Sequence, residues 1–457
     1  MLLGAAGAGW LLTQRGDGGS TGEAPRAAPL RLGLPINPAE LDQAGLTRAL
    51  DLARRAGVTE LNAGVAWWYV SAGRPRGSYD WRALDRLIDA AKASGMRVRL
   101  QLSGTPDAVH PEVANAVPDP DRRVWYPPRT PAQLQLWGQF VHATVDHFHG
   151  RVSSFEMWNE PNIEAFWRPA PAPGEYAWLL AESYRSAKQA SSSAKVVFGG
   201  LSHNDFGYLQ RYYAEARRLF PDAATHGIFF DLLDVHPYTD GRSPDDTSPD
   251  TVVQGLFGAV DKSFPGLRLM KAVMDRNEGG RGSGGKAVVV GEYGFRGAPA
   301  GLPAVVPDRR RAYFLKRAVA SAGGMPFVSS LSWYGFLPDS GTPANWAIVT
   351  EQGEVSWTYQ ALADLAARRE PVVRLPDPAG LRPGPAVIRP VLDGVGTSAV
   401  IHTELYVDGV LEAEADGPAV RWTGPRRSTG QGEAQLVVYT RDRHAWPSNI
   451  VTMPAGG

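Results

Sequence analysis

The chain has 457 residues, and its 47 basic side chains balance its 47 acidic ones, so the formal net charge is zero. This balance gives no reason to expect a nucleic-acid partner or binding to an acidic membrane surface. The absence of cysteine excludes disulfides, thiol catalysis and thiolate metal sites.

The N-terminal segment, residues 1–29, opens with the apolar sequence MLLGAAGAGWLL. This run is too short to cross a bilayer and has the length of the hydrophobic part of a signal peptide. It lacks a basic stretch in front, so an ordinary floppy terminus is the alternative. The polar, glycine-rich residues that follow are typical of a flexible tether. We therefore expect a signal or anchor remnant, a membrane tether through the N-terminus, and a secreted, periplasmic or cell-surface location.

Short apolar runs then alternate with longer amphipathic segments, whose helical periodicity is clearest at 80–95, 175–190 and 309–324. Eight strands, each followed by a helix, are the count of a (β/α)8 TIM barrel, which we predict for residues 30–369. A doubly wound open sheet is the alternative, but it usually has fewer strands and a glycine-rich first turn. The predicted strands are 30–36, 58–65, 96–102, 152–158, 195–200, 230–236, 286–292 and 327–333.

The composition changes after residue 369. Residues 370–385 are rich in proline and are expected to form a linker. Residues 386–457 contain several short strand-like runs, with a hairpin signal at Asp408 and Gly409. We predict a small, immunoglobulin-like β-sandwich here. It carries no catalytic motif, so we expect it to be dispensable for chemistry.

Two predicted barrel strands end on a glutamate. The fourth strand runs to Glu160 and is stopped by Pro161, and the seventh ends at Glu292 between two glycines. Active-site residues of a barrel lie at the C-terminal ends of its strands, so the two carboxylates should face each other across the mouth. Such a pair suits hydrolysis of a glycosidic bond. One group protonates the departing oxygen while the other attacks the anomeric carbon or activates water.

Alternation along the fourth strand predicts that Glu156 and Trp158 also point into the barrel. Glu156 would lie deeper than Glu160, paired with Arg97 or Arg99 of the neighbouring strand.

Four segments carry a resemblance to a known family: WNEPN (158–162), DVHPY (234–238), GEYGF (291–295) and LSWYGF (331–336). Over residues 30–368 the chain resembles the retaining glycoside hydrolases of clan A. Within the clan it resembles family 39, in particular the bacterial exopolysaccharide endoglycosidases. The Gly-Glu-Tyr-Gly segment is equally similar to family 5. The sequence NAGVAWWYV follows the second strand, where many clan members have an arginine.

The resemblance implies that Glu160 is the general acid/base and Glu292 the nucleophile. Asn159 would hydrogen-bond the 2-hydroxyl of the sugar. The other residues implied to line the site are His236, Tyr238 and Trp333. The implied function is endo-acting, retaining hydrolysis of O-glycosidic bonds in a polysaccharide. An exo-acting glycosidase on oligosaccharides and a non-catalytic carbohydrate-binding barrel are the alternatives.

Aromatic residues just after strands are candidates for further sugar-binding positions, although core packing would explain each of them equally well. They are Trp67, Trp68, Trp125, Tyr126, Trp167 and Trp346.

No cofactor, nucleotide or metal is expected. The segment GRGSGGK (280–286) has P-loop spacing, but Ala287 stands where Ser or Thr is required, and a strand follows instead of a helix. His147 and His149 are two residues apart at a helix end and do not share a face.

Overall fold

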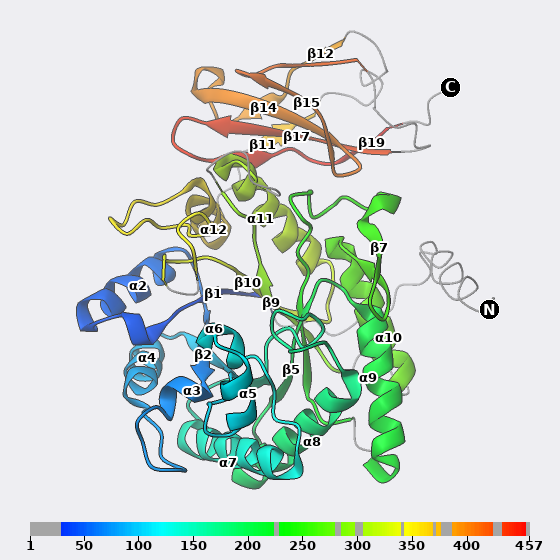
Figure 1. Ribbon diagram of the computed structural model, residues 1–457. Coiled ribbons are helices and arrows are strands. Elements are labelled where there is room, and N and C mark those ends of the chain that lie inside the picture. The colour runs from blue at the N-terminus through cyan, green and yellow to red at the C-terminus, as the bar shows by residue number, and fades with distance from the viewer. Residues whose placement is uncertain are drawn as a thin grey trace, which may run out of the picture.

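The structure, a computed structural model, describes residues 29–223, 228–278, 285–297, 305–339, 342–368, 372–375, 386–423 and 432–453. Eight parallel strands form a closed barrel in which β10 pairs back with β1 (Figure 1). All eight predicted strands are present, so the predicted TIM barrel is confirmed. In barrel order they are β1 (Arg31–Pro35), β2 (Glu60–Ala66), β3 (Arg97–Ser103), β4 (Ser154–Met157), β5 (Val196–Ser202), β6 (Leu232–His236), β9 (Val288–Tyr293) and β10 (Val328–Trp333).

Helices surround the barrel, and their starts carry ordinary capping signals. In α7, for example, Thr130 and Gln133 form a capping box around Pro131. The large helices are α2 (Gln43–Arg55), α4 (Arg82–Ala93), α7 (Pro131–Phe148), α8 (Pro173–Ala190), α9 (Phe206–Leu219), α10 (Leu267–Glu278), α11 (Asp308–Gly323) and α12 (Trp357–Ala367). Short helices α3 (Trp67–Val70), α5 (Pro111–Ala116) and α6 (Pro120–Arg123) follow β2 and β3. Within the described ranges, no helix has the length and apolar character needed to cross a membrane.

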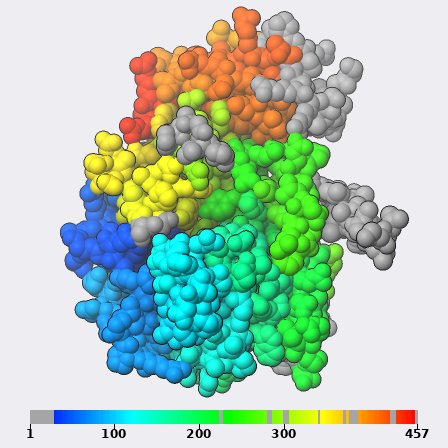
Figure 2. All heavy atoms as spheres, viewed as in Figure 1, coloured from blue at the N-terminus to red at the C-terminus, as the bar shows by residue number. Residues whose placement is uncertain are grey.

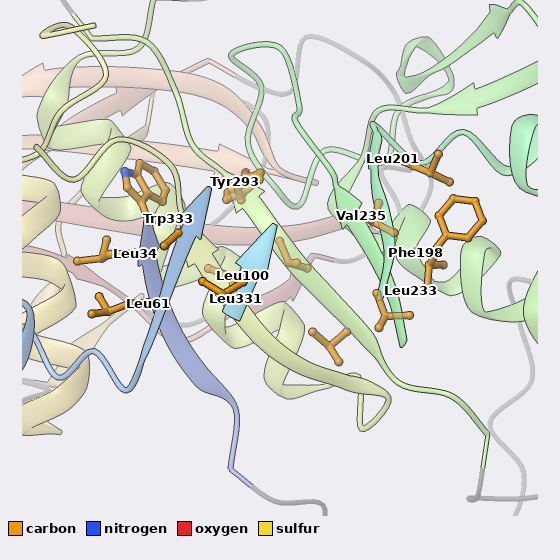
Figure 3. Close-up of a cluster of buried hydrophobic side chains, with 14 of the residues drawn as sticks. Leu34, Leu61, Leu100, Phe198, Leu201, Leu233, Val235, Tyr293, Leu331 and Trp333 are labelled. Atoms are coloured by element: carbon orange, nitrogen blue, oxygen red, sulfur yellow. The ribbon is translucent and has the colours of Figure 1, made fainter. Parts of the chain in front are cut away.

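The two faces of the barrel strands differ in chemistry. Side chains such as Leu34, Leu100 and Phe198 are fully buried and apolar (Figure 3). The interior is polar: Arg99 of β3 donates to Asp234 of β6, and these strands are not neighbours, so their contact crosses the barrel. Barrel interiors are more often filled with branched apolar residues. This one instead holds a charge network beneath the mouth.

An antiparallel hairpin, β7 (Val252–Gly255) and β8 (Gly258–Asp261), lies between β6 and α10. The sequence pattern does not predict this hairpin, because its short, glycine-flanked strands carry little apolar periodicity.

The C-terminal domain consists of antiparallel sheets. Strands β15, β14 and β17 form a sheet that β18 and β19 extend, while β12 pairs with β16 and β11 with β13. Leu405 and Leu436 of the larger sheet pack against Ile388 and Trp422 of the β12–β16 pair. The strands are β11 (Val372–Arg374), β12 (Ala386–Ile388), β13 (Val391–Asp393), β14 (Val400–Val407), β15 (Val410–Asp416), β16 (Val420–Trp422), β17 (Gly432–Thr440), β18 (Ala445–Pro447) and β19 (Val451–Met453).

The hairpin expected at Asp408 and Gly409 joins β14 to β15. Both residues have positive φ, 50° and 75°, as a tight two-residue hairpin turn requires.

The predicted linker needs a correction. Where the structure describes it, residues 372–374 form β11 and pair with β13, so this part belongs to the C-terminal domain. The remaining linker residues, residues 1–28 and most of the P-loop-like segment lie outside the described residues.

The C-terminal domain also packs directly on α11 of the barrel (Figures 1 and 2). Tyr313 donates to Gln435 at 3.0 Å, and Lys316 donates to the Ala445 carbonyl at 2.8 Å. These buried contacts do not support the expectation that the domain is dispensable.

Candidate active site

The turn that presents Glu160 has an unusual backbone. β4 ends at Met157, after which Trp158 and Glu160 have φ of 77° and 38°, values that side-chain-bearing residues rarely adopt. Such conformations cost on the order of 1–3 kcal/mol each and persist where surrounding contacts hold them. Here the Trp158 N–H donates to the Leu102 carbonyl at 2.8 Å, and the Glu160 N–H donates to the Gly200 carbonyl at 3.0 Å. The two neighbouring strands therefore fix the turn.

The same turn overturns the predicted orientation of Trp158. Positive φ at this residue breaks the alternation of the strand, and the indole ring leaves the barrel interior. It packs edge-on against Trp125, Trp137 and Trp167, with ring centroids 6.3, 5.8 and 5.7 Å away. Glu156 does point inward, and its carboxylate lies 3.7 Å from Arg99, as predicted.

His236 brings the two predicted catalytic carboxylates together. Its Nδ1 lies 3.0 Å from Glu160 Oε1 and 3.6 Å from Glu292 Oε2. One oxygen of each glutamate and one ring nitrogen all lie within 4.8 Å of one another. Tyr238 donates its hydroxyl to Glu292 Oε2 at 2.9 Å. The ends of β4, β6 and β9 thus assemble one site, as the motifs predicted.

The electrostatics of the site follow from burial and from these contacts. Burial opposes the charged imidazole of His236, but the Glu292 charge and the hydrogen bond with Glu160 outweigh it and raise the pKa of His236 to about 10. Burial also raises the pKa of Glu292, although His236 and Tyr238 act in the opposite direction. Burial raises the pKa of Tyr238 well above its usual value. The contacts with the two glutamates therefore favour the protonated imidazole of His236.

Below the mouth, Asp234 links the charge network to the strand that carries Glu292. It accepts from the Gly291 N–H at 2.7 Å and from Arg99. Burial raises the pKa of Asp234 to about 8, although the Arg99 charge favours its ionised form. A buried ionisable pair of this kind fixes geometry only while both partners remain in place.

Asn159 and Asn162 flank Glu160 on the same turn. Asn159 accepts from Gln101 at 3.1 Å through its amide oxygen, which leaves its amide nitrogen for a ligand. Asn162 pairs with the main chain of Ser202 in both directions, at 2.9 and 3.0 Å. Asn162 therefore ties the turn to β5, a role that the sequence did not reveal.

The structure divides the predicted aromatic residues into two groups. Trp67, Trp167 and Trp333 are core residues with at most 4% of their surface exposed, which corrects the expectation that they contact sugar. Trp333 packs edge-on against Tyr293, 5.9 Å away, and Figure 3 shows it beside Leu34. By contrast, Trp68 is 43% exposed. Trp125, Tyr126 and Trp346 are half-buried.

Trp346 and Tyr334 lie close to Glu292. Trp346 packs edge-on against Tyr238 at 6.0 Å and against Tyr334 at 5.3 Å. Burial raises the pKa of Tyr334, and the Glu292 charge adds to this rise. Tyr334 was missed, although its place next to Trp333 in LSWYGF was a usable signal.

Among the described residues, Glu292 has His236 and Tyr238 as partners and no arginine contact.

In the part of the chain that the structure describes, three clusters bring possible metal-ligand atoms within 4.8 Å of one another: Glu160–His236–Glu292, Glu156–Asp234–His236 and His402–Glu404–Glu414. In the first, the raised pKa of His236 disfavours a metal ligand, which must be the neutral imidazole. In the other two, a guanidinium from Arg99 or Arg310 already contacts the carboxylates. The chemistry of these groups favours ion pairs over metal coordination.

Known proteins resemble the chain weakly in sequence and clearly in fold. No family model matches the chain. Over 182 residues it is 25% identical to a beta-xylosidase from Geobacillus stearothermophilus, a match that spans 36% of this chain and 34% of that protein. The chain thus covers about a third of the length of that relative.

Solved structures of related enzymes share the fold. A family 39 glycoside hydrolase from Bacteroides cellulosilyticus WH2 superposes with a TM-score of 0.56 at 18% identity, over 87% of this chain and 81% of that one. The GH39 enzyme of Xanthomonas axonopodis pv. citri gives 0.52 at 14% identity, over 83% and 81%. A monomeric beta-xylosidase from Caulobacter crescentus CB15 gives 0.51 at 15% identity, over 91% and 76%. The predicted resemblance is thereby confirmed: the chain has a (β/α)8 barrel fold similar to that of family 39 glycoside hydrolases of clan A.

Proposed function

We propose that the protein is a retaining glycoside hydrolase in which Glu160 is the acid/base and Glu292 the nucleophile. The observation that carries the proposal is the approach of the two carboxylates, with an oxygen of each within 4.8 Å of the other. Retaining glycosidases place these groups about 5–5.5 Å apart, whereas inverting ones leave roughly 6.5–9.5 Å for a water molecule. The short separation supports double displacement.

The surroundings of the two glutamates support these roles. Tyr238 holds Glu292 Oε2, which leaves Oε1 to attack the anomeric carbon as the glycosidic bond breaks. Glu160 gives its proton to the departing oxygen and then takes one from the water that releases the sugar. The positive charge of His236 stabilises ionised Glu292 and, once Glu160 has given up its proton, offsets the repulsion between the two carboxylates. Asn159 offers its amide nitrogen to the sugar 2-hydroxyl.

For the substrate, we propose endo-acting cleavage of a polysaccharide by an exported enzyme. The exposed rings of Trp68 and Tyr69, which follow β2, support binding of more than one sugar residue. Exo-acting cleavage is the second candidate, favoured by the beta-xylosidases among the similar proteins. Export, the N-terminal tether and the exclusion of nucleotides and nucleic acid rest on the sequence alone.

Product analysis separates endo-acting from exo-acting cleavage. The protein should release reducing sugars from one member of a polysaccharide panel, with oligosaccharides as the first products. Release of single sugars, with turnover of aryl β-xylosides, would favour the exo-acting candidate. Inactivity on polysaccharides and on activated aryl glycosides would contradict hydrolysis altogether.

Azide rescue tests the assignment of the two glutamates. Glu160→Ala should still cleave aryl glycosides with good leaving groups, and azide should give a glycosyl azide of retained configuration. Glu292→Ala should be inactive, and azide should give the inverted product. Glu164→Ala is the control, because that carboxylate lies on the same loop with 64% of its side chain exposed. The opposite pattern of azide products would reverse the assignment.

A further inference from the structure

Gly200 of β5 lies directly against the His236 ring. A Cβ added to Gly200 would lie 2.1 Å from His236 Nε2, 2.6 Å from Cε1 and 2.7 Å from Cδ2. Gly200 is not among the glycines with positive φ, so its backbone would accept another residue. Glycine is needed here because the ring occupies the space of a side chain.

Gly200 also contacts the main chain of the proposed acid/base. Its carbonyl accepts from the Glu160 N–H at 3.0 Å, and its own N–H donates to Glu156 at 2.9 Å. The pairing of β5 with β6 shifts register between Phe198 and Leu201, which places an irregularity at the glycine pair. Bulges of this kind re-aim groups next to active sites.

The imidazole of His236 has polar partners on one edge only. Nδ1 faces Glu160 and Glu292, whereas Nε2 is buried with no hydrogen-bond partner in the described part of the chain. Two further acidic groups face the ring without a hydrogen bond to it: Asp234, two residues earlier on β6, and Glu156 of β4 each place a carboxylate oxygen within 4.8 Å of one of its nitrogens. No second hydrogen bond therefore fixes the ring, and its position depends on the surface that it rests on.

We propose that Gly200 is a positioning residue: its bare Cα seats the His236 ring so that Nδ1 reaches both carboxylates, while its carbonyl holds the Glu160 backbone. The catalytic consequence rests on the proposed function, but the seating of the ring does not. A methyl group at this position would displace the ring from Glu160, Glu292 or both. Misplacement of catalytic groups by about 1 Å can cost on the order of 100-fold in rate.

The test combines kinetics with histidine NMR on the full-length protein. Gly200→Ala should lower kcat about 100-fold with little change in KM. With 15N-labelled histidine, His236 should stay doubly protonated from about pH 6 to pH 9 in the wild type, because its pKa is raised to about 10. In Gly200→Ala its titration should move toward the ordinary value of about 6.5. The resonance is assigned by its loss in His236→Ala.

Gly33→Ala is the matched control. A Cβ at Gly33 of β1 would lie 2.2 Å from Ser332 Oγ, a similar clash with a side chain that is hydrogen-bonded to Asn62 and not to Glu160, His236 or Glu292. This variant should lose stability but keep the His236 titration and kcat of the wild type. An equal change in the His236 titration of both variants would overturn the proposal, because it would show a general effect of crowding the barrel.

A double variant covers the case in which Gly200→Ala does not fold. Without the imidazole the methyl group has space, so Gly200→Ala/His236→Ala should be as stable as His236→Ala alone. A double variant that also fails to fold overturns the proposal, as does a folded Gly200→Ala protein with unchanged His236 titration and kcat. An inactive wild type whose His236 titration shifts in Gly200→Ala would contradict the proposed hydrolase and leave the seating of the ring standing.

Discussion

Two glutamates, one half-buried at the barrel mouth and one buried at the domain interface, differ in how fully they are hydrogen-bonded. Glu404 of β14 accepts from Arg310 at 2.6 and 3.0 Å, from Tyr406 at 2.7 Å and from Tyr439 at 2.5 Å. Glu292 accepts one close hydrogen bond, from Tyr238. The first carboxylate is saturated and the second is not.

The pKa values of these glutamates shift in opposite directions as a result. Burial opposes ionisation of both. At Glu404, the contact with His402 at 3.7 Å and the hydrogen bonds from Arg310 and Tyr439 outweigh burial and lower its pKa to about 2. At Glu292, burial prevails and the pKa is raised. Glu404 uses its lone pairs to hold two domains together, whereas the role proposed for Glu292, attack on a substrate, requires that some lone pairs stay free.

Among the variants that test this difference between the two glutamates, Glu292→Ala should have the largest effect on activity. Loss of the nucleophile should reduce kcat/KM by at least about 10⁴-fold. The free energy of unfolding at pH 7 should not fall by more than roughly 1 kcal/mol, since ionising a glutamate with a raised pKa costs stability at that pH. Kinetics and urea denaturation measure the two quantities. A large loss of stability would mean that Glu292 is structural, like Glu404.

Glu404→Ala should have the converse effect, a loss of about 3–5 kcal/mol in the free energy of unfolding, because the buried hydroxyls of Tyr406 and Tyr439 would lose their acceptor and Arg310 would keep only the more exposed Glu414. Glu414→Ala is the control. Its carboxylate lies 3.1 Å from Arg310 but is 46% exposed, so the expected loss is below about 1 kcal/mol. Equal losses in the two variants would show that saturation of Glu404 is unimportant.

Tyr238→Phe tests the hydrogen bonding of Glu292 through the pH dependence of activity. The Tyr238 hydroxyl lowers the pKa of Glu292, so removing it should raise that pKa further. Activity needs ionised Glu292, so the acid limb of the kcat/KM profile, already above the ordinary glutamate value of about 4.3, should move to higher pH. The maximal rate should fall roughly 10-fold. An acid limb that stays in place or moves down would contradict the assignment of Glu292.

The sequence revealed the parts of the molecule that local patterns encode. The eight barrel strands were visible because apolar runs end at polar or glycine-rich segments. Glu160 and Glu292 were found because strand ends meet at one rim of a barrel. Two consecutive glycines inside β5 were a signal that was missed, since such a pair indicates a bulge or a close contact.

Other features depend on contacts between distant residues. The pairing of Arg99 with Asp234 crosses the barrel, and no local pattern states which side chain lies opposite another. The inward orientation predicted for Trp158 was wrong because its φ reverses sign, which the alternation of a strand cannot anticipate. The burial of Trp167 and Trp333 follows from packing against other elements, which neither residue type nor position reveals.

The closure of the barrel by β1 and β10 also bears on how the chain is made. Arg31 pairs with Ser330, so roughly 300 residues must be synthesised between the two partners, and contacts of such long range fold slowly. The ribosome makes Glu160 well before β9 and β10. Until β10 emerges, β1 and β9 each have an unpaired edge, and nascent chains with open edges are prone to aggregate. Assembly of the two carboxylates into one site is therefore a late event in the synthesis and folding of this protein.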